Sequence, residues 1–411
     1  MMNQELIEVD WLKGVKVLLI GHYIPGPLAA YLLKCLGAEV IKCEPPFYDY
    51  MRQLPPFIKG KKGKMSAYFR ALNAGFKSIV VDFKEEGGVE VLKDLIIASG
   101  VLIDGNRANY LDKVLGEAVD NINPGIIHIP ITAYGLKGPM RDIAGHDNNI
   151  LSSTGTLSYT PVSTQGTPSI FSVQLADITS GYIAAIIAVS SILGRRNSNS
   201  NVEIGTVDAS MMHAAFFLNQ IYVAGMNATG KPPVPGRELL NGGLPNYTMY
   251  LTKDEKSIFF GPIEPNLFKN FCETTCREDL MNLLDKDNSK LYGELVSLFK
   301  SKKLKEWEDL LHDCDCCFTR VNNLEEAMND PQIKELGLIT EVEDEAYGTL
   351  SLTGFPAGFT EDSLQPDFTE PAPEPGEHTN EILKEFLSYN SEKIEKLINN
   401  KVVYKNKEVV K

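Results

Sequence analysis

The sequence predicts an α/β protein with a large Rossmann-like domain on a parallel sheet and a smaller α+β domain. Over residues 14–131, short β-rich runs alternate with helical runs, which is typical of a parallel sheet with helices on its faces. A connection rich in glycine and proline, residues 225–245, then separates this part from a second region of mixed strands and helices. At 411 residues the chain is also too long for one small core.

The chain begins with a strand–helix–strand unit. Residues 14–21 form a compact β-rich run, residues 28–36 follow a helical pattern, and residues 39–43 form the next strand. Gly37 lies where that helix should end, a position that favours glycine. The turn after the first strand, Gly21 to Gly26, lacks both the Gly-Lys-Ser/Thr of a P-loop and the G-x-G-x-x-G pattern.

The alternation continues along the chain. Further strands are expected at residues 78–82, 101–104, 125–131 and 202–206, and helices at residues 87–98, 178–193 and 208–224. Ligands of such sheets bind at the carboxyl ends of the strands. Those ends correspond here to residues 21–26, 104–107 and 132–139.

We predict that both ends of the chain contribute to the large domain. The predicted parts are a large domain over residues 1–224, a linker at 225–245, a small domain at 246–336 and a return to the large domain at 337–411. Strands are expected in the small domain at residues 247–252 and 257–260, and in the returning part at residues 337–342 and 348–353.

Charge and composition narrow the class of protein. The net charge of −14 argues against a nucleic-acid or membrane partner. Polar residues interrupt the apolar run 178–193, which favours a buried helix over a membrane span. The start of the sequence lacks a signal-peptide pattern, and seven cysteines suggest reduced thiols, so we expect a cytoplasmic protein. The cysteine spacings match no common zinc site, and we predict no metal.

One histidine and one aspartate stand out as chemical candidates. His146 lies in a short loop between Gly145 and Asp147, and Asp147 is expected to cap the helix that follows. Asp177 is placed at the start of the apolar helix near Ile178. If an imidazole and a carboxylate lie on opposite sides of one carbon, they can pass a proton across it.

A third carboxylate, Glu264, could orient the imidazole of His146. Each of the three residues also has a structural interpretation, as a surface histidine, a helix cap and a helix-start carboxylate. No Gly-x-Ser-x-Gly elbow supports a serine nucleophile, and His22, His128, His213 and His312 lack a comparable setting. His128, inside an apolar strand, is interpreted as a packed core residue.

Several motifs are spread along nearly the whole chain: Gly26-Pro27, Leu36-Gly-Ala-Glu-Val-Ile-Lys-Cys-Glu-Pro-Pro46, Tyr68-Phe-Arg-Ala-Leu-Asn73, Tyr134-Gly-Leu-Lys-Gly-Pro139 and Gly376-Glu-His-Thr379. Together they resemble one superfamily, that of the family III CoA-transferases and α-methylacyl-CoA racemases (the CaiB/BaiF type). The resemblance implies an acyl-CoA substrate, no metal or redox cofactor, and a homodimer of two interlocked chains.

The resemblance also implies roles for particular residues. His146 and Asp177 match the two acid/bases of the racemases, and Glu264 matches the glutamate that pairs with the histidine. Free N–H groups at the helix start near Ile178 are expected to stabilise enolate charge. The residues expected to contact CoA are Tyr23, Ile24, Pro25, Leu72, Arg107, Tyr134, Lys137 and Asp147.

Some positions depart from the superfamily pattern. The run Asp104-Gly-Asn-Arg107-Ala-Asn109 replaces the usual Arg-Pro-Gly ending, although Arg107 is retained. Pro45 stands where many members have an arginine, and Ile150 replaces a common tyrosine. These changes fall at positions expected to contact the adenine end of CoA and to shape the acyl pocket.

Two enzyme activities within the superfamily are kept as hypotheses. The leading hypothesis is a racemase or epimerase acting at C2 of a 2-methylacyl-CoA, with His146 and Asp177 as its two acid/bases. Tyr50-Met-Arg52 and Ser66-Ala-Tyr-Phe69 are similar to the transferases instead, in which Asp177 would be a nucleophile that carries CoA as a thioester. A CoA-binding protein without catalysis is a third hypothesis, which the intact Asp177 disfavours.

Overall fold

The computed structural model describes residues 7–61, 63–197, 204–358, 364–365 and 370–405. The chain forms two compact units. We call Met1–Thr154, Phe171–Leu218 and Gln332–Lys411 the large unit, and Gly155–Ile170 and Asn219–Pro331 the small unit. The large unit takes in both ends of the chain.

The boundaries differ from the predicted ones because residues 155–170 and 219–245 belong to the small unit. The ring of Tyr159 packs on Tyr222 with centroids 4.2 Å apart, and its hydroxyl donates to Asn219 Oδ1. Asn241 Nδ2 donates to the carbonyl oxygen of Tyr159 at 3.1 Å. These contacts hold the short segment 155–170 on residues 219–241, which include part of the predicted linker 225–245.

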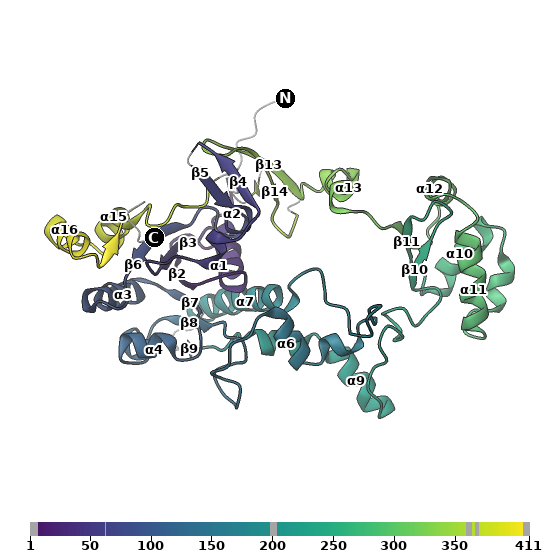
Figure 1. Ribbon diagram of the computed structural model, residues 1–411, viewed down its shortest axis with the longest axis horizontal. Coiled ribbons are helices and arrows are strands. Elements are labelled where there is room, and N and C mark those ends of the chain that lie inside the picture. The colour runs from purple at the N-terminus through teal and green to yellow at the C-terminus, as the bar shows by residue number, and fades with distance from the viewer. Residues whose placement is uncertain (1–6, 62, 198–203, 359–363, 366–369, 406–411) are drawn as a thin grey trace. The chain divides into compact units, whose positions relative to one another are not determined.

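A parallel-dominated sheet forms the centre of the large unit, in agreement with the predicted class (Figure 1). Among the described residues its strand order is β16-β6-β3-β2-β7-β8-β9, and only β16 is antiparallel to its neighbour. The strands are β2 (Lys16–Gly21), β3 (Glu39–Glu44), β6 (Lys77–Val81), β7 (Val101–Gly105), β8 (Ile127–Pro130), β9 (Gly205–Thr206) and β16 (Val403–Tyr404). Part of the predicted strand 202–206 lies outside the described residues.

Helices cover both faces of this sheet. One apolar core joins Leu18, Ile41 and Ile79 of the sheet to Leu92 and Leu95 of the helix over 86–98. The helices of the large unit are α1 (Pro25–Cys35), α2 (Ala67–Leu72), α3 (Glu86–Ala98), α4 (Tyr110–Leu115), α5 (Val119–Ile122), α6 (Asp147–Ser153), α7 (Leu175–Asn197), α8 (Met211–Phe217), α15 (Thr379–Glu381) and α16 (Ser391–Asn399). A short 3-10 helix, Tyr50–Gln53, follows β3.

Small residues let α1 and α7 pack closely. A Cβ atom on Gly26 would lie 3.2 Å from the Leu19 side chain of β2, and one on Gly181 would lie 2.9 Å from the carbonyl oxygen of Pro25. The start of α1 is therefore held between the sheet and α7. This places the turn after β2 beside the first turns of α7.

Helix α7 differs from its prediction in its start and its burial. It begins at Leu175, so Asp177 lies within the first turn and is not the cap. The helix was expected to be buried, but Tyr182, Ile186 and Leu193 are exposed along one side. Of the described residues, Leu175–Arg196 is long and apolar enough to cross a membrane, and 33% of its most apolar window is buried. Length and composition alone give only weak support for a membrane span.

Two hairpins and one strand pair complete the large unit. Their strands are β4 (Phe57–Gly60) with β5 (Gly63–Ser66), β13 (Ile339–Asp344) with β14 (Gly348–Thr353), and β1 (Ile7–Glu8) with β15 (Leu364–Gln365). The strands predicted at 337–342 and 348–353 correspond to β13 and β14. The helix predicted over 208–224 is divided instead, with α8 in the large unit and α9 (Gln220–Thr229) in the small unit.

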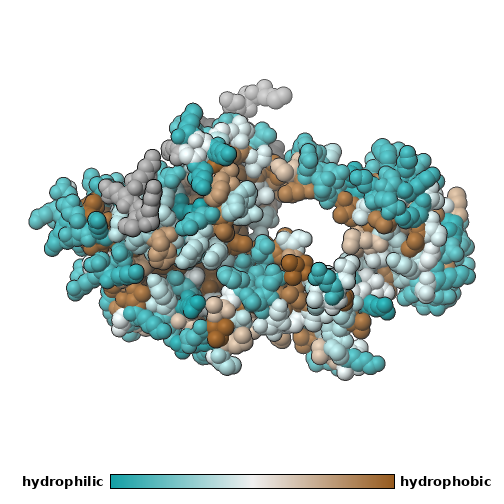
Figure 2. All heavy atoms as spheres, viewed as in Figure 1, coloured by the Kyte–Doolittle hydropathy of each residue, from teal (hydrophilic) through white to brown (hydrophobic). Residues whose placement is uncertain are grey.

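The small unit is an α+β structure with its own core. Phe260, Phe271, Phe299 and Trp307 are fully buried, and the Trp307 Nε1–H donates to the carbonyl oxygen of Phe299 at 2.9 Å. Besides α9, it contains the antiparallel strands β10 (Thr248–Leu251), β11 (Ser257–Phe260) and β12 (Phe318–Arg320), and the helices α10 (Pro265–Thr274), α11 (Asn288–Phe299), α12 (Leu304–Leu311) and α13 (Leu324–Met328). Hydrophilic residues predominate on the displayed face of both units (Figure 2).

Candidate active site

The strand order of the sheet reverses between β2 and β7. From β2 the chain moves to β3 and β6 on one side, and from β7 to β8 and β9 on the other. A Cβ atom on Gly21 at the end of β2 would lie 2.9 Å from the Cα of Gly105 at the end of β7. Only glycine allows the two strand ends to lie this close. A switch point of this kind is where doubly wound sheets bind ligands.

A cavity of about 1030 Å³ lies at this switch point within the large unit. Residues 22–25 after β2 and 105–108 after β7 form part of its wall. Further residues that line it are Tyr50, Leu54, Tyr68, Leu72, His146, Asp177 and Tyr182. The structure thus brings His146 and Asp177 to one cavity, together with Tyr23, Ile24, Pro25, Leu72 and Arg107 of the predicted CoA contacts.

His146 stands at the N-cap position of α6. Its backbone N–H donates to Asn149 Oδ1 at 3.0 Å, which fixes the start of the helix. The preceding Gly145 packs on the ring of Tyr134, where a Cβ atom would come within 2.9 Å. The imidazole is exposed and meets the edge of the Tyr23 ring, with centroids 5.6 Å apart and planes at 85°. The loop is therefore ordered while the ring stays accessible.

Asp177 lies in the first turn of α7, half-buried beside the same cavity. Burial, and to a smaller extent the negative charge of Asp147, raises the pKa of its carboxyl to about 7. The carboxyl group is therefore partly protonated and partly ionised near neutral pH. That property suits a group that must both give and accept a proton.

Asp147 has a different role from the one predicted. It is buried, and Oδ2 accepts hydrogen bonds from the backbone N–H groups of Ala176 at 2.7 Å and Asp177 at 3.2 Å. Asp147 thus caps α7, not the helix α6 in which it is the first residue. Burial raises its own pKa, an effect that these two backbone hydrogen bonds oppose.

The N–H groups expected to stabilise an enolate are therefore already engaged. Asp147 takes those of Ala176 and Asp177, and the N–H of Ile178 donates to the carbonyl oxygen of Gln174 at 2.9 Å. The start of α7 therefore acts on the cavity through the positive end of its helix dipole and not through these three N–H donors.

Three predicted CoA contacts lie away from the cavity wall. Asp147 caps α7, and Tyr134 is buried behind Gly145. Lys137 is exposed in the loop that follows Tyr134. None of the three is among the residues that line the large cavity.

Glu264 belongs to the small unit. It is exposed at the N-cap position of α10, directly before Pro265. Its pairing with His146 stays a prediction.

A buried ion pair under the cavity was not predicted. Lys42 Nζ lies 2.7 Å from Asp49 Oδ2, both side chains are fully buried, and Nζ also donates to the carbonyl oxygen of Gly21 at 3.3 Å. Asp49 Oδ1 accepts from the backbone N–H groups of Met51 at 2.8 Å and Tyr23 at 3.4 Å. A lysine inside the apolar strand 39–43 was the signal that could have revealed this pair.

His22, which was given no functional role from the sequence, also lines the cavity. Burial lowers the pKa of its imidazole, while Asp49, with Oδ1 3.8 Å from Nδ1, raises it. The net shift is downward, so the neutral ring is favoured there.

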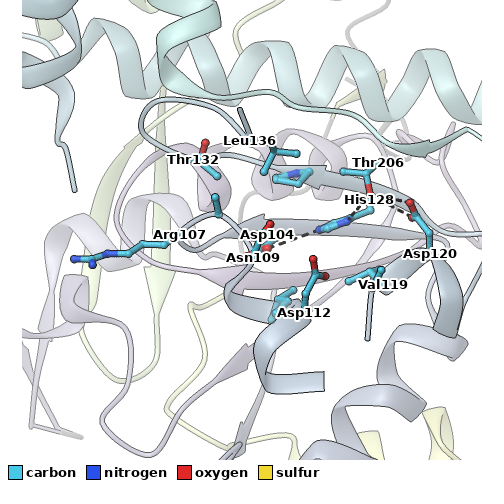
Figure 3. Close-up of a pocket in the computed structure, with 14 residues that line it drawn as sticks. Asp104, Arg107, Asn109, Asp112, Val119, Asp120, His128, Thr132, Leu136 and Thr206 are labelled. Atoms are coloured by element: carbon cyan, nitrogen blue, oxygen red, sulfur yellow. Dashed lines mark hydrogen bonds and ion pairs between the residues drawn. The ribbon is translucent and has the colours of Figure 1, made fainter. Parts of the chain in front are cut away.

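A second, smaller cavity of about 80 Å³ lies behind the loop that carries Arg107 (Figure 3). His128, expected in the core, is buried there but is polar in its contacts. Its Nδ1 lies 2.9 Å from Thr206 Oγ1, and its Nε2 lies 3.7 Å from Asp104 Oδ2. Asp104 Oδ1 in turn accepts from the Asn106 backbone N–H at 3.0 Å. These contacts shape the turn that carries Arg107.

No set of three or more His, Cys, Asp or Glu side chains is placed to hold a metal ion in the part of the chain that the structure describes.

A family model for CoA-transferase family III matches residues 12–379. The chain belongs to CoA-transferase family III.

Relatives of this family member carry two kinds of activity. The chain is 27% identical over 403 residues to human alpha-methylacyl-CoA racemase, covering 96% of this chain and 98% of the relative. It is 28% identical over 408 residues to (R)-2-hydroxy-4-methylpentanoate CoA-transferase of Clostridioides difficile, covering 95% and 99%. The chain is therefore about equally similar in sequence to a racemase and to a transferase.

The solved structures agree with the family fold. A CAIB/BAIF family protein from Brucella suis superimposes with a TM-score of 0.77 at 23% identity, covering 91% of this chain and 99% of that one. The chain thus shares its fold with that protein.

Proposed function

We propose that this chain is an acyl-CoA racemase or epimerase that moves the α-proton of a 2-methylacyl-CoA thioester. One observation carries the proposal: an exposed imidazole, His146, and a carboxyl with a pKa of about 7, Asp177, line the same cavity. The two groups come from the starts of two different helices, α6 and α7.

The reaction needs a base on one face of C2 and an acid on the other. Neutral His146 removes the α-proton, and the electron pair moves into the thioester carbonyl to give an enolate. Protonated Asp177 then delivers a proton to C2 from the opposite face, so the configuration is inverted. The reverse direction exchanges the two roles. A carboxyl that is about half protonated near pH 7 can serve both directions.

The remaining parts of the substrate have partners on the cavity wall. In this proposal Arg107, after β7, pairs with a phosphate of CoA, and Tyr23, Ile24, Pro25 and Leu72, which line the same cavity, contact the pantetheine arm. Coenzyme A enters as part of the substrate, and we propose no further cofactor. We also propose that the enzyme acts in the cytoplasm.

We further propose that the protein is a homodimer. Tyr182, Ile186 and Leu193 form an exposed apolar side of α7, and Phe216 and Phe217 of α8 are exposed as well. Large apolar side chains gathered on adjacent helices are typical of an interface. The interlocked form of the dimer is part of this proposal.

The second candidate is a CoA-transferase, which the equal similarity to the Clostridioides difficile transferase favours. Asp177 as a carboxylate would attack the thioester carbonyl, giving a mixed anhydride and releasing CoA thiolate. The thiolate would then attack the Asp177 carbonyl, giving an aspartyl-CoA thioester and freeing the first acid. An acceptor carboxylate would complete the exchange in reverse order.

One experiment separates these functions. The enzyme is incubated with 2-methylbutanoyl-CoA in D₂O, without an acceptor acid, and deuterium at C2 is measured by mass spectrometry. Exchange is expected for the wild type and is lost in His146→Ala, whereas the control variant His312→Ala, altered at an exposed histidine of the small unit, retains it.

Other results of this experiment would support one of the two alternative functions. No exchange, together with inactivation by hydroxylamine after exposure to acyl-CoA and modification at Asp177, would establish the transferase instead. Neither exchange nor inactivation, with CoA still bound, would indicate a binding protein.

A further inference from the structure

Three cysteines lie together in the small unit, in the loop between α12 and β12, and the proposed reaction uses none of them. Cys316 is 1% exposed and belongs to the apolar core of this unit. Cys314 is half-buried against the same core, and Cys317 is exposed. All three are free thiols. A small reagent in solution can therefore meet Cys314 but not Cys316.

Two of these thiols touch each other. Cys314 and Cys316, which we call the thiol pair, are joined by a hydrogen bond between their side chains. The Thr274 hydroxyl of α10 also donates to Cys314 Sγ at 3.3 Å. Burial, and then the hydrogen bond to Cys314, raises the pKa of the Cys316 thiol, so Cys316 keeps its proton. The two sulfurs are thus held in contact, with Cys314 on the solvent side.

Backbone contacts hold the loop in this shape. The Cys314 N–H donates to the carbonyl oxygen of Leu311, at the end of α12, at 3.0 Å. Asn270 Nδ2 of α10 donates to the carbonyl oxygen of Asp315 at 2.9 Å, so the one residue between the paired thiols is also fixed. Because the loop is already ordered, a bond between the two sulfurs requires no unfolding of the small unit.

Cys317 is less reactive than its exposure suggests. Burial of part of its thiol, and then the negative charges of Glu264 and Asp315, raises the pKa of that thiol. A thiol with a raised pKa contains little thiolate at neutral pH, and the thiolate is the reactive form. The exposed cysteine of the loop is therefore disfavoured as the attacking group, and the half-buried Cys314 is left for that role.

The loop is also joined to the turn that carries Glu264. The Gly261 N–H donates to the carbonyl oxygen of Cys317 at 3.0 Å, and Glu264 follows at the N-cap position of α10. A covalent bond between Cys314 and Cys316 draws their sulfurs closer together than the hydrogen bond does. Because Cys317 is the next residue in the chain, its carbonyl group moves with the loop, and the turn 261–264 loses a contact that orders it.

We infer that the thiol pair is a redox-active dithiol, which low-molecular-weight disulfides close to a Cys314–Cys316 disulfide. The Cys314 thiolate attacks one sulfur of the disulfide reagent, which gives a mixed disulfide and releases one thiolate. Cys316 then gives up its proton and attacks Cys314 Sγ, which releases the second thiolate. The protein loses two electrons and two protons, and the reagent gains them as two thiols. An effect on catalysis rests on the proposed function, in which Glu264 orients His146.

Peptide mapping of the full chain tests the pairing. The protein is equilibrated without air in a buffer of reduced and oxidised glutathione, and the remaining thiols are blocked with N-ethylmaleimide before digestion and mass spectrometry. Reduced glutathione in excess removes mixed disulfides from isolated thiols, whereas the thiol pair closes because its effective concentration is high. We expect Cys314 and Cys316 to be unlabelled and joined, Cys317 to be labelled, and dithiothreitol to reverse the bond.

Two variants separate the attack from the closure. In Cys316→Ala, Cys314 still attacks but no second thiol resolves the product, so oxidised glutathione alone should leave a glutathione adduct at Cys314. In Cys314→Ser the buried Cys316 should stay unmodified. Cys276→Ser, at an exposed cysteine of the small unit outside this loop, is the control and should retain the Cys314–Cys316 disulfide. A wild type in which all three thiols of the loop are labelled, or in which the disulfide uses Cys317, would overturn the inference.

Hydrogen–deuterium exchange of the backbone amides in the turn 261–264 measures the effect on Glu264. Exchange should be faster in the oxidised protein, since the Gly261 N–H loses its bond to Cys317, and unchanged in Cys314→Ser after the same treatment. Equal rates in the oxidised and reduced wild type would show that the disulfide does not act on this turn, against the inference. Neither measurement contains acyl-CoA, so both can succeed while deuterium exchange at C2 fails, and the reverse.

Discussion

Asp147 holds the backbone of Asp177 from the same loop that carries His146. Its Oδ2 accepts the Asp177 N–H at 3.2 Å and the Ala176 N–H at 2.7 Å. Since His146 and Asp147 are neighbours in the chain, the contact couples the positions of the two proposed acid/bases. It also brings a negative charge close to the Asp177 carboxyl, whose pKa burial has already raised.

The first prediction concerns that charge. In Asp147→Asn the acceptor oxygen is kept and the charge is removed, so the pKa of Asp177 should fall from about 7 by up to ~1 unit. The limb of the kcat/KM profile that reports this group should shift to lower pH. In Asp147→Ala the cap is lost as well, and we expect an added loss of ~1 kcal/mol in the free energy of unfolding. An unchanged profile in Asp147→Asn would assign the raised pKa to burial alone.

The second prediction concerns stability. Because the pKa of Asp177 is raised in the folded state, the unfolded chain releases this proton near pH 4 and the folded chain only near pH 7. The free energy of unfolding therefore falls as pH rises through that window. Asp177→Asn removes the penalty, so at pH 8 the variant should be ~1–3 kcal/mol more stable than the wild type while inactive.

Thermal unfolding of both proteins at pH 5 and pH 8 measures this effect. The difference in melting temperature should be larger at pH 8 than at pH 5. Asp142→Asn, at an exposed carboxylate of the His146 loop, serves as the control and should show no such difference. A difference that is the same at both pH values would contradict the raised pKa.

The third prediction tests the buried pair of Lys42 and Asp49. Lys42→Met leaves the Asp49 carboxylate buried without its cation, and should lower the free energy of unfolding by ~3–5 kcal/mol. The double variant Lys42→Met with Asp49→Asn should recover a large part of that loss, because the uncompensated charge is gone. Urea unfolding of the wild type, the Lys42→Met and Asp49→Asn single variants and the double variant gives the coupling, and additive losses would show that the pair is not coupled.

The sequence was sufficient for the part of the fold that local patterns determine. Strands β2 and β3 and helix α1 are predicted from alternating β-rich and helical runs, and Gly37 does end the helix region. Helix α7 shows the limit. Its apolar run predicted a buried helix, but hydrophobicity alone does not tell which side faces the core, and Ile186 lies exposed.

The candidate site depended on tertiary contacts that spacing cannot reveal. His146 and Asp177 were singled out by their loop and helix positions, and the family resemblance gave them joint roles. Asp49 was missed because its partners, Lys42 and the Tyr23 backbone, come together only when β2 and β3 pair. Asp147 was predicted to cap the wrong helix, because the helix that it does cap begins 28 residues later in the chain, at Leu175.

The fourth prediction addresses the switch point. In Gly21→Ala the new Cβ would meet the backbone of Gly105 at 2.9 Å, and a strand cannot move aside as a side chain can. We expect a loss of ~1–3 kcal/mol in stability and weaker binding of acyl-CoA, since His22 and Tyr23 follow directly. Gly194→Ala in α7 is the control, because no atom lies within 4 Å of its new Cβ and the helix should be unchanged or more stable.

The last prediction concerns the exposed side of α7. Ile186 is 58% exposed in the middle of that side, so a charge there faces whatever covers it in the assembly. If two copies of the chain pack through α7, Ile186→Glu buries an unpaired carboxylate at the interface and should prevent the interlocked dimer from assembling, so that the variant is monomeric in sedimentation experiments. Ile97→Glu, at an equally exposed isoleucine of α3, should leave the mass unchanged. A dimer that survives Ile186→Glu would place the interface elsewhere, because an uncompensated buried charge costs more than an ordinary side-chain contact contributes.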